Sequence, residues 1–334
     1  MPIFGRKPKP ATTAATVPID PAFGDPELAR LRQAMTDADW PTVRAVFDGA
    51  ADPDDQATFV DVARHVPGSE EWLPDVVRAN LDDTLPLLLY GARVTAWAWE
   101  ARTGLLPEYV SRDQFEVFFE RLRIAEDALQ EVVRREPDNT AAWHQLVITA
   151  RGLELGTDEA RRRFDEVVAR HPWHIRAHQQ MLQQLCLKWF GSHEAMHAFA
   201  RDAMLAAPAG SALGHLVAVA HLEHWAYLAR EKPTNRYLRS REVLASLHEA
   251  ADRSVRHPDY RPRRDWPEIS NAFAMAFSLA GDRRAAAEQF EVIGDLATQW
   301  PWLYLDGEDP GRAFCARRQE ADAGRDRGGG AARA

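Results

Sequence analysis

Cysteine is scarce in this sequence, and long hydrophobic runs are absent. Only two cysteines occur among the 334 residues, Cys186 and Cys315, and they lie far apart. We therefore expect no disulfide framework, in keeping with a reducing compartment. No apolar stretch approaches the roughly 18 residues that a membrane-spanning helix needs, and the basic N-terminus is not followed by the apolar segment of a signal peptide. These absences predict a cytoplasmic protein that does not insert into membranes.

Two common sequence motifs of catalysis are lacking as well. The chain has no Gly-x-Ser-x-Gly nucleophile elbow and no glycine-rich phosphate loop before a helix. Carboxylates are abundant, but no pair stands out as an acid and base couple. The sequence therefore favours a protein that is not an enzyme, and it predicts no cofactor.

Negative charge is concentrated near the N-terminus. From Asp20 to Leu85 there are 15 acidic and 5 basic residues, a net charge of −10, whereas the rest of the chain has 35 acidic and 36 basic residues. Nucleic-acid phosphates bind to basic surfaces, so nucleic acid is not an expected partner. The acidic residues are typical of solvated helix faces and helix N-caps.

Two tandem units organise the middle of the chain, between Pro137 and Pro208. The pattern Gly-(Thr/Ser)-x-Glu-Ala-x-x-x-Phe begins at Gly156 and again 35 positions later at Gly191. A repeat period of this length is typical of a helical solenoid.

These units resemble the tetratricopeptide repeat, a helix-turn-helix unit of about 34 residues. The residues that carry the resemblance are Trp143, Leu146, Ala160, Phe164 and Pro172 in the first unit and His178, Met181, Ala195, Phe199 and Pro208 in the second. The first-helix glycine of that family is replaced by Val147 and Leu182, and one residue is inserted before Ala160. The resemblance implies a right-handed α-α superhelix whose concave face is lined by the first helix of each pair.

Helical periodicity, punctuated by proline and glycine, extends over the rest of the chain. It predicts an all-α protein of about seven helix pairs. The segment 85–102 is apolar almost all round, which is typical of a helix buried on several sides. We expect a disordered arm over residues 1–22, acidic helical pairs over 23–82, the repeat domain over 83–302 and a largely disordered tail over 303–334.

The resemblance also implies which side chains face the groove. Ligands of the resembled family contact fixed positions of each first helix, and these positions are mostly polar and partly cationic here, among them His144, Arg151, Arg176, Gln179, Gln183, His215 and Glu223. The lysine and asparagine that clamp peptide C-termini in that family are absent. We therefore expect a scaffold that binds a protein or an extended peptide in its groove. The alternative is that these residues face water or a neighbouring helix.

Histidine is the one reactive residue type that clusters, with eight of the 12 histidines in residues 171–224. A spacing of four residues on a helix can present two imidazoles to one metal ion, and it occurs in the pairs His174/His178 and His193/His197. Core and helix-capping roles explain such histidines without a metal. The alternative is a metal-dependent protein or enzyme with the ligands His174, His178, Glu194 and His197. A third hypothesis is a structural module that oligomerises through an exposed helix face.

Overall fold

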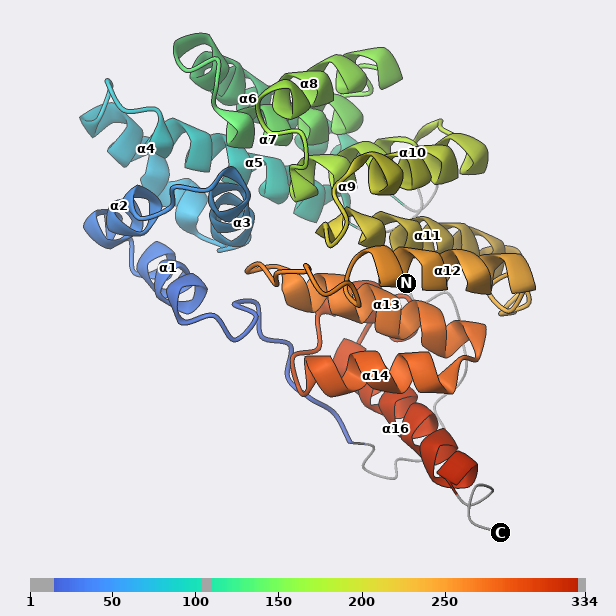
Figure 1. Cartoon of the computed structure of the whole chain (residues 1–334). Coiled ribbons are helices and arrows are strands. Elements are labelled where there is room, and N and C mark those ends of the chain that lie inside the picture. Colours follow the sequence, from blue (N-terminus) through green and yellow to red (C-terminus); the bar gives the residue numbers. More distant parts are fainter. Residues whose placement is uncertain (1–14, 104–109, 330–334) are drawn as a thin grey trace. The chain divides into compact units, whose positions relative to one another are not determined.

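The structure is a computed structural model that describes residues 15–103 and 110–329, with side chains up to residue 323. Over these residues all regular secondary structure is helical, without a strand, and helices that follow one another pack in pairs (Figure 1). Within this part of the chain, no helix combines the length and the apolar character needed to cross a membrane. The prediction of an all-α fold is confirmed.

The helices form two compact units, which we describe separately. The α1–α9 unit spans Asp25–Gly191, and the α10–α16 unit contains the chain from Ser192 onward together with the segment that ends at Gly24. This division differs from the predicted one, which separated residues 23–82 from 83–302. The acidic helices belong to the same unit as the first repeat, and the division falls inside the second repeat.

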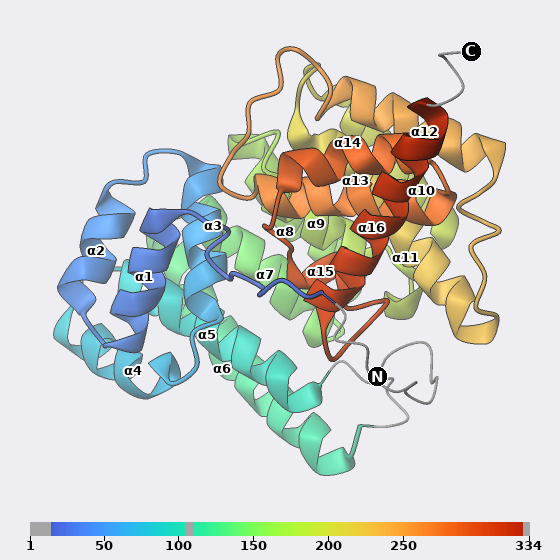
Figure 2. The same ribbon diagram turned by 90° about the horizontal axis from the view of Figure 1, so that it is seen from below.

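The α1–α9 unit is built around one long apolar helix, α5. Helices α3 and α4 pack on α5, and α6 and α7 contact it as well; Figure 2 shows α5 and α6 side by side. The predicted burial of this helix on several sides is confirmed. The helices of the unit are α1 (Pro26–Thr36), α2 (Trp40–Asp48), α3 (Pro53–Arg64), α4 (Ser69–Ala79), α5 (Leu85–Arg102), α6 (Arg112–Arg135), α7 (Thr140–Gly152), α8 (Thr157–Arg170), α9 (Ile175–Gln184) and the short 3-10 helix η2 (Leu187–Trp189).

Helix starts in this unit follow short-range sequence signals. Asp25 accepts hydrogen bonds from backbone N–H groups in the first turn of α1, with Pro26 at the first helical position. Ser111 and Gln114 form a reciprocal capping box at α6. Asn139 caps α7 in the same way as Asp25 caps α1. These caps satisfy N–H groups that have no partner inside the helix.

The first copy of the repeat forms the helical hairpin α7–α8. Gly156 is the N-cap of α8 and has a φ of +89°, a region that favours glycine. Ala160 and Phe164 are buried one and two turns later, at 0% and 3% exposure. Trp143 and Leu146 of α7 are buried as well. The burial of these four side chains agrees with the repeat alignment.

The second copy differs from the first in phase. Ser192 caps the following helix by accepting a hydrogen bond from the Ala195 N–H group, so this helix begins one residue later relative to the pattern. Met196 and Ala200 are buried, whereas Ala195 is exposed and Phe199 only half-buried. A shift of one residue turns a helix face by about 100°, and the repeat alignment therefore places the wrong pair of side chains in the core.

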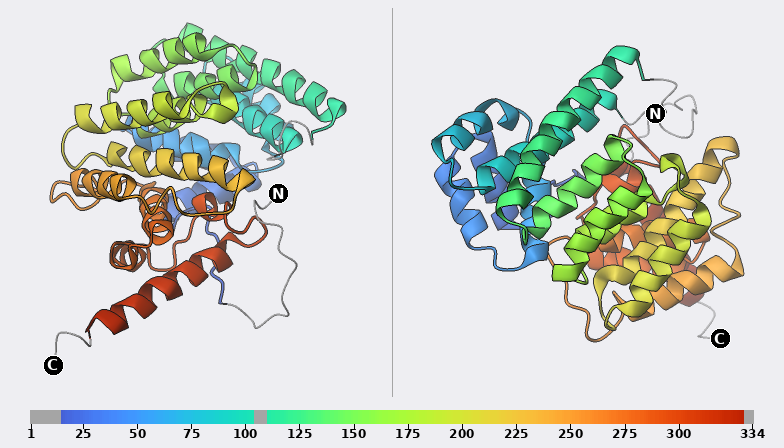
Figure 3. Two further views of the ribbon diagram at one scale, coloured as in Figure 1. Left: turned by 90° about the vertical axis from the view of Figure 1, so that its right-hand side faces the viewer. Right: turned by 90° about the horizontal axis from the view of Figure 1, so that it is seen from above.

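The α10–α16 unit contains the remaining helices. Helices α11 and α12 are neighbours, as are α13 and α14, and α16 packs on α14 as the long red helix of Figure 3. Phe314 of α16 is fully buried, so the prediction of a disordered tail from residue 303 is wrong for this helix. The helices are α10 (His193–Ala206), the 3-10 helix η3 (Ala212–Gly214), α11 (His215–Glu231), α12 (Arg241–Arg253), α13 (Trp266–Ala280), α14 (Arg283–Ile293), α15 (Gln299–Trp302) and α16 (Pro310–Gly329).

The segment before α1 also belongs to the α10–α16 unit. The carbonyl of Val17 lies directly against Gly311 of α16, where a Cβ atom would be 1.9 Å from the carbonyl oxygen. The prediction of a disordered arm over residues 1–22 is therefore wrong from residue 15 onward. Residues 1–14 lie outside the described part of the chain.

Candidate functional site

Two of the predicted groove residues lie under α3 rather than on an open face. Helix α3 packs across α5, α7 and α9 within the α1–α9 unit. His144 on α7 is fully buried, and Arg176 on α9 is 5% exposed, with its Nη1 atom 3.1 Å from Oδ2 of Asp61 on α3. The expected surface position of these two side chains is therefore incorrect, because another helix of the same unit covers them.

Three other predicted groove residues are half-buried. Arg151 at the end of α7 donates from Nη1 to the backbone oxygen of Gln180 and from Nη2 to its Oε1 atom, at 3.1 and 2.8 Å. Gln179 and Gln183 lie on α9 and are partly accessible. Of this set, Arg151 contributes to the surface described below.

The predicted groove residues of the α10–α16 unit are buried as well. His215 is 1% exposed, with Nδ1 2.6 Å from the carbonyl oxygen of Ala212. Glu223 is 7% exposed and accepts a hydrogen bond of 2.7 Å from the hydroxyl of Tyr304. The segment after α15 thus supplies the hydrogen-bond partner of Glu223.

One ion pair joins α3 to α9. Asp61 is 2.7 Å from Nε of Arg64 and 3.1 Å from Nη1 of Arg176. Burial alone would raise the pKa of the Asp61 carboxyl, but the two guanidinium groups outweigh it and hold this pKa well below its usual range. Removing one partner from such a pair leaves an uncompensated charge, so this contact favours the packing of α3 on α9.

A second contact fixes the start of α3 to the start of α9. Asp52, Asp54 and His171 are the one group of three histidine, cysteine or carboxylate residues in the described part of the chain whose ligand atoms all lie within 4.8 Å of one another. Asp54 accepts a hydrogen bond from the Ile175 N–H group, and Asp52 accepts one from the Asp54 N–H group, both at 2.9 Å. The positive ends of two helix dipoles stabilise these carboxylates and disfavour a cation. The arrangement is a structural clamp.

A set of mostly half-buried aromatic and arginine side chains lies at the end of α5, next to the start of α6 and the turn η2. Trp99 is at the centre of these contacts. Its ring is 5.4 Å from that of Trp189 and packs edge-on against Phe118 at 4.9 Å. The guanidinium of Arg102 lies 5.2 Å from the Trp189 ring, and that of Arg151 lies 5.9 Å from it. We call this set the aromatic–arginine surface; it comprises Trp99, Arg102, Phe115, Phe119, Arg151, Trp189 and Phe190.

Arg102 and Arg151 contribute positive charge to this surface, and Arg102 is only 8% exposed. Burial lowers the pKa of Arg102, and Glu154 is the carboxylate that partly opposes this effect. The Nη1 atom of Arg102 donates to the carbonyl of Thr103 at the long distance of 3.4 Å. A guanidinium in a partly apolar setting is well suited to a carboxylate, which it binds through two parallel hydrogen bonds.

Phe190 is the most exposed part of this surface. Phe190 is 87% exposed, and its backbone has a φ of +67°. The next residue, Gly191, approaches Leu185 so closely that a Cβ atom would lie 2.1 Å from the Leu185 carbonyl oxygen. The turn that presents the Phe190 ring is therefore fixed by close backbone packing. Leu187, 37% exposed, lies in the same turn.

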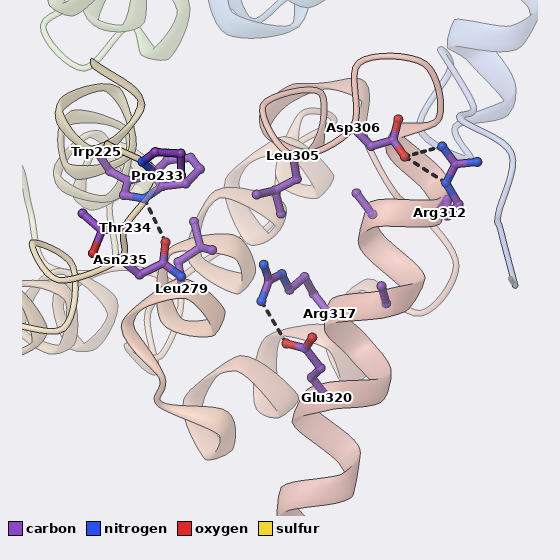
Figure 4. Close-up of a pocket in the computed structure, with 12 residues that line it drawn as sticks. Trp225, Pro233, Thr234, Asn235, Leu279, Leu305, Asp306, Arg312, Arg317 and Glu320 are labelled. Carbon is purple, nitrogen blue, oxygen red and sulfur yellow. Dashed lines mark hydrogen bonds and ion pairs between the residues drawn. The ribbon is translucent and has the colours of Figure 1, made fainter. Parts of the chain in front are cut away.

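A pocket of about 500 Å³ lies in the α10–α16 unit between α11, α13 and α16 (Figure 4). Its charged side chains already bind each other: Arg312 donates from Nε to Asp306 at 2.8 Å, and Arg317 donates to Glu320 at 2.9 Å. Its walls include Trp225, whose ring N–H group donates to the side-chain oxygen of Asn235. These internal pairs offer no uncompensated charge for recognising a ligand, so we assign no ligand to this pocket.

The first predicted histidine pair has structural roles in α9. His174 is the N-cap of this helix, with Nδ1 accepting from the Ala177 N–H group at 3.2 Å. His178 bonds the His174 carbonyl through Nδ1 at 2.8 Å and packs edge-on against Phe164 at 4.9 Å. The other two members of the predicted metal set, Glu194 and His197, lie in the other unit.

The second histidine pair lies in a cluster within the α10–α16 unit. His193 and His197 of α10 contact His221 and His224 of α11: the rings of His193 and His224 stack at 3.7 Å, and Nε2 of His197 is 3.1 Å from Nδ1 of His224. The hydroxyl of Tyr237, in the turn before α12, is 3.1 Å from the same His197 nitrogen and 2.7 Å from Nδ1 of His221. We call these five residues the histidine–tyrosine cluster.

A sequence signal for this cluster exists in the segment 193–197. His193, Glu194 and His197 match the pattern His-Glu-x-x-His, which presents two imidazoles on one face of a helix. The predicted ligand set took only the second half of this pattern and missed His193. His224 and Tyr237 carry no such signal, because the folding of α11 against α10 brings them to the cluster.

The imidazoles of the cluster are neutral at neutral pH. Burial, together with the neighbouring imidazoles, lowers the pKa of His197 to about 4, that of His224 to about 4 and that of His221 to about 3. Burial also lowers the pKa of His193 and raises that of the Tyr237 hydroxyl. Neutral imidazole is the form that accepts hydrogen bonds and binds metals.

Comparison with known proteins does not identify a family. The chain matches no protein-family model, and a search of curated proteins finds no match. The function is therefore argued from the residues and their geometry.

Proposed function

We propose that this protein is a helical-repeat interaction module that binds a protein or peptide partner on its aromatic–arginine surface. The observation that carries the proposal is Phe190, with its 87% exposure and its φ of +67°. Left-handed backbone conformations are uncommon for residues other than glycine, and they cluster at functional sites. Aromatic residues are enriched in interfaces, where an exposed phenyl ring can act as an anchor.

The composition of the surface supports this proposal. Interface positions that dominate binding energy are enriched in tryptophan, tyrosine and arginine, and Trp99, Trp189, Arg102 and Arg151 lie together here. Arginine presents a planar fork of donors that fits a carboxylate. The expected partner is therefore a segment with an apolar side chain that packs on Phe190 and a carboxylate that pairs with an arginine.

The repeat architecture supports a binding role in a general way. Tandem helical hairpins give proteins extended surfaces for partners, and the α7–α8 hairpin has the buried residues that the tetratricopeptide resemblance implies. The proposed site differs from the expected groove because α3 covers His144 and Arg176.

A pair of matched variants tests the proposed site. Phe190→Asn removes the ring while introducing a residue that tolerates a positive φ, so the melting temperature should not fall. Leu81→Asn is the control, since Leu81 is 67% exposed in the same unit and outside the surface. We expect partners captured from native extract by the immobilised wild-type chain to be kept by Leu81→Asn and lost by Phe190→Asn, with a loss of affinity of at least about tenfold for the purified partner.

Two results would contradict this proposal in different ways. Equal affinity of the wild-type chain and Phe190→Asn for each purified partner would place the binding site elsewhere. Light scattering that shows an oligomer of the wild-type chain and a monomer of Phe190→Asn would identify a second copy as the occupant, and the protein would then be an oligomerising structural module.

A further inference from the structure

We propose that the histidine–tyrosine cluster binds one divalent transition-metal ion, with Nε2 of His197, Nδ1 of His224 and the hydroxyl oxygen of Tyr237 as ligands. This site lies apart from the aromatic–arginine surface in the chain and does not depend on the proposed partner binding. It also differs from the metal ligands that the sequence suggested, since of those four residues only His197 belongs to it.

The distances from His197 to the other two ligand atoms are close to those within a coordination shell. His197 Nε2 lies 3.1 Å from His224 Nδ1 and 3.1 Å from the Tyr237 oxygen. Two ligand atoms at about 2.0–2.1 Å from a tetrahedral zinc ion are roughly 3.3 Å apart. Small side-chain movements therefore suffice to place an ion between them.

Hydrogen bonding alone leaves an excess of contacts at His197. The Nε2 atom of an imidazole has either one hydrogen to donate or one lone pair to accept with, yet it has two polar neighbours at 3.1 Å. An ion at this point would satisfy all three ligand atoms at once. The cluster contains another imidazole whose hydrogen-bonding capacity is unused. Neither ring nitrogen of His193 has a hydrogen-bond partner, although both nitrogens are buried.

His193 and His221 complete the site in different ways. The ring of His193 stacks face to face on that of the ligand His224 at 3.7 Å and supports its orientation. His221 bonds the Tyr237 oxygen through Nδ1 at 2.7 Å, and its Nε2 is 3.2 Å from the hydroxyl of Ser246. Such outer partners orient the ligands of a metal ion.

The donor set selects a class of ion. Two imidazole nitrogens and one phenol oxygen suit zinc, copper or nickel, whereas calcium and magnesium require several carboxylate or carbonyl oxygens. Among the five residues of the cluster there is no carboxylate, and the Glu194 side chain on the same helix is exposed. Binding to the phenolate form of Tyr237 releases its proton to solvent, so the observed heat should depend on the buffer.

Titration of the full chain with zinc chloride or copper chloride, after treatment with a chelator, tests this inference. We expect one ion per chain, an uptake of protons by the buffer, and a loss of affinity of at least about 100-fold in His197→Ala and in His224→Ala. With copper, Tyr237→Phe should lose the phenolate-to-copper absorption band. Circular dichroism checks that each variant is folded, and the conservative variants His224→Gln and Tyr237→Phe serve if an alanine variant is not.

A control variant separates this site from the clamp between α3 and α9. His171→Asn removes the imidazole of the Asp52, Asp54 and His171 group and should leave the affinity unchanged. Loss of binding in His171→Asn but not in His197→Ala would overturn the inference, as would wild-type affinity in the His224→Gln and Tyr237→Phe variants. Absence of saturable binding to the wild-type chain at about 100 µM ion would overturn the inference too, because the dissociation constants of specific metal sites lie well below this concentration.

Discussion

At the scale of single residues, the same position of a repeated pattern can have different environments. Phe164 and Phe199 occupy equivalent places in the two copies. Phe164 is 3% exposed and packs against His178, whereas Phe199 is half-buried, since its helix starts one residue later relative to the pattern. The two rings should therefore contribute differently to stability.

Replacing each ring by alanine measures this difference. We expect Phe164→Ala to lower the free energy of unfolding by about 3–5 kcal/mol, the usual loss for a fully buried phenylalanine. Phe199→Ala should cost less than about 2 kcal/mol, because part of its ring already contacts water. Urea denaturation of the two variants gives both values. Equal losses would mean that α10 has the same phase as α8, contrary to the structure.

At the scale of a helix, α9 depends on a histidine cap. The Nδ1 atom of His174 accepts from the Ala177 N–H group, and the residue is fully buried. Burial lowers the pKa of His174 to about 4, an effect that the Asp54 carboxylate partly opposes. A cap of this kind must stay unprotonated, and this requirement makes the stability of the helix depend on pH.

His174→Asn should reduce the acid sensitivity of the protein. Between pH 6.5 and about 4 the unfolded chain binds a proton at this histidine and the folded chain does not, so the free energy of unfolding falls as the pH falls. A difference of one unit in pKa between the folded and the unfolded chain corresponds to a free energy of about 1.4 kcal/mol. The shift of His174 therefore contributes about 3 kcal/mol to the pH dependence of the free energy of unfolding. Asparagine keeps the cap and does not titrate.

Guanidinium denaturation at pH 7 and pH 4.5 provides the measurement. The wild-type chain should lose more stability between these two conditions than His174→Asn does. The remaining loss in the variant is assigned to other buried histidines, such as His144, whose pKa burial lowers well below its usual value. An unchanged difference between the two pH values would show that His174 does not titrate in this range.

At the scale of the whole chain, residues from both ends contribute to the α10–α16 unit. The hydroxyl of Thr16 donates to Asp309 at 2.9 Å, and the Val17 carbonyl lies against Gly311. Only glycine permits this approach, since a Cβ atom there would be 1.9 Å from the carbonyl oxygen. The segment before α1 thus supports helix α16 although nearly the entire sequence separates them.

Gly311→Ala should displace this segment and destabilise the protein by about 1–3 kcal/mol. Gly49→Ala is the matched control: the nearest atom to a Cβ at Gly49 is 3.5 Å away and φ is −79°, so its effect should stay within about 0.5 kcal/mol. Thermal or urea denaturation gives both values. In a chain that lacks residues 1–24, Gly311→Ala should have no further cost, because the two changes remove the same contact. An equal cost in the full and the shortened chain would argue against this packing.

The sequence by itself determined the helices of this protein. The helix starts at Asp25 and Asn139 and the burial of the segment 85–102 follow from signals within a few residues of one another, namely caps, proline and the period of apolar side chains. The repeat period indicated the α7–α8 hairpin for the same reason. Its second copy shows the limit of this reasoning, since one residue at the start of α10 changed which side chains are buried.

Only the tertiary structure decided which of these residues share a surface or a site. His144 and Arg176 have the repeat positions of groove residues, but α3 covers them, and its Asp61 pairs with Arg176. Phe190 has no distinguishing pattern, and the exposure of its ring follows from the turn around Gly191. His224 and Tyr237 reach His197 because α10 packs on α11. Local periodicity specifies which face of a helix is apolar, but the choice of the element that covers this face depends on packing between residues far apart in the chain.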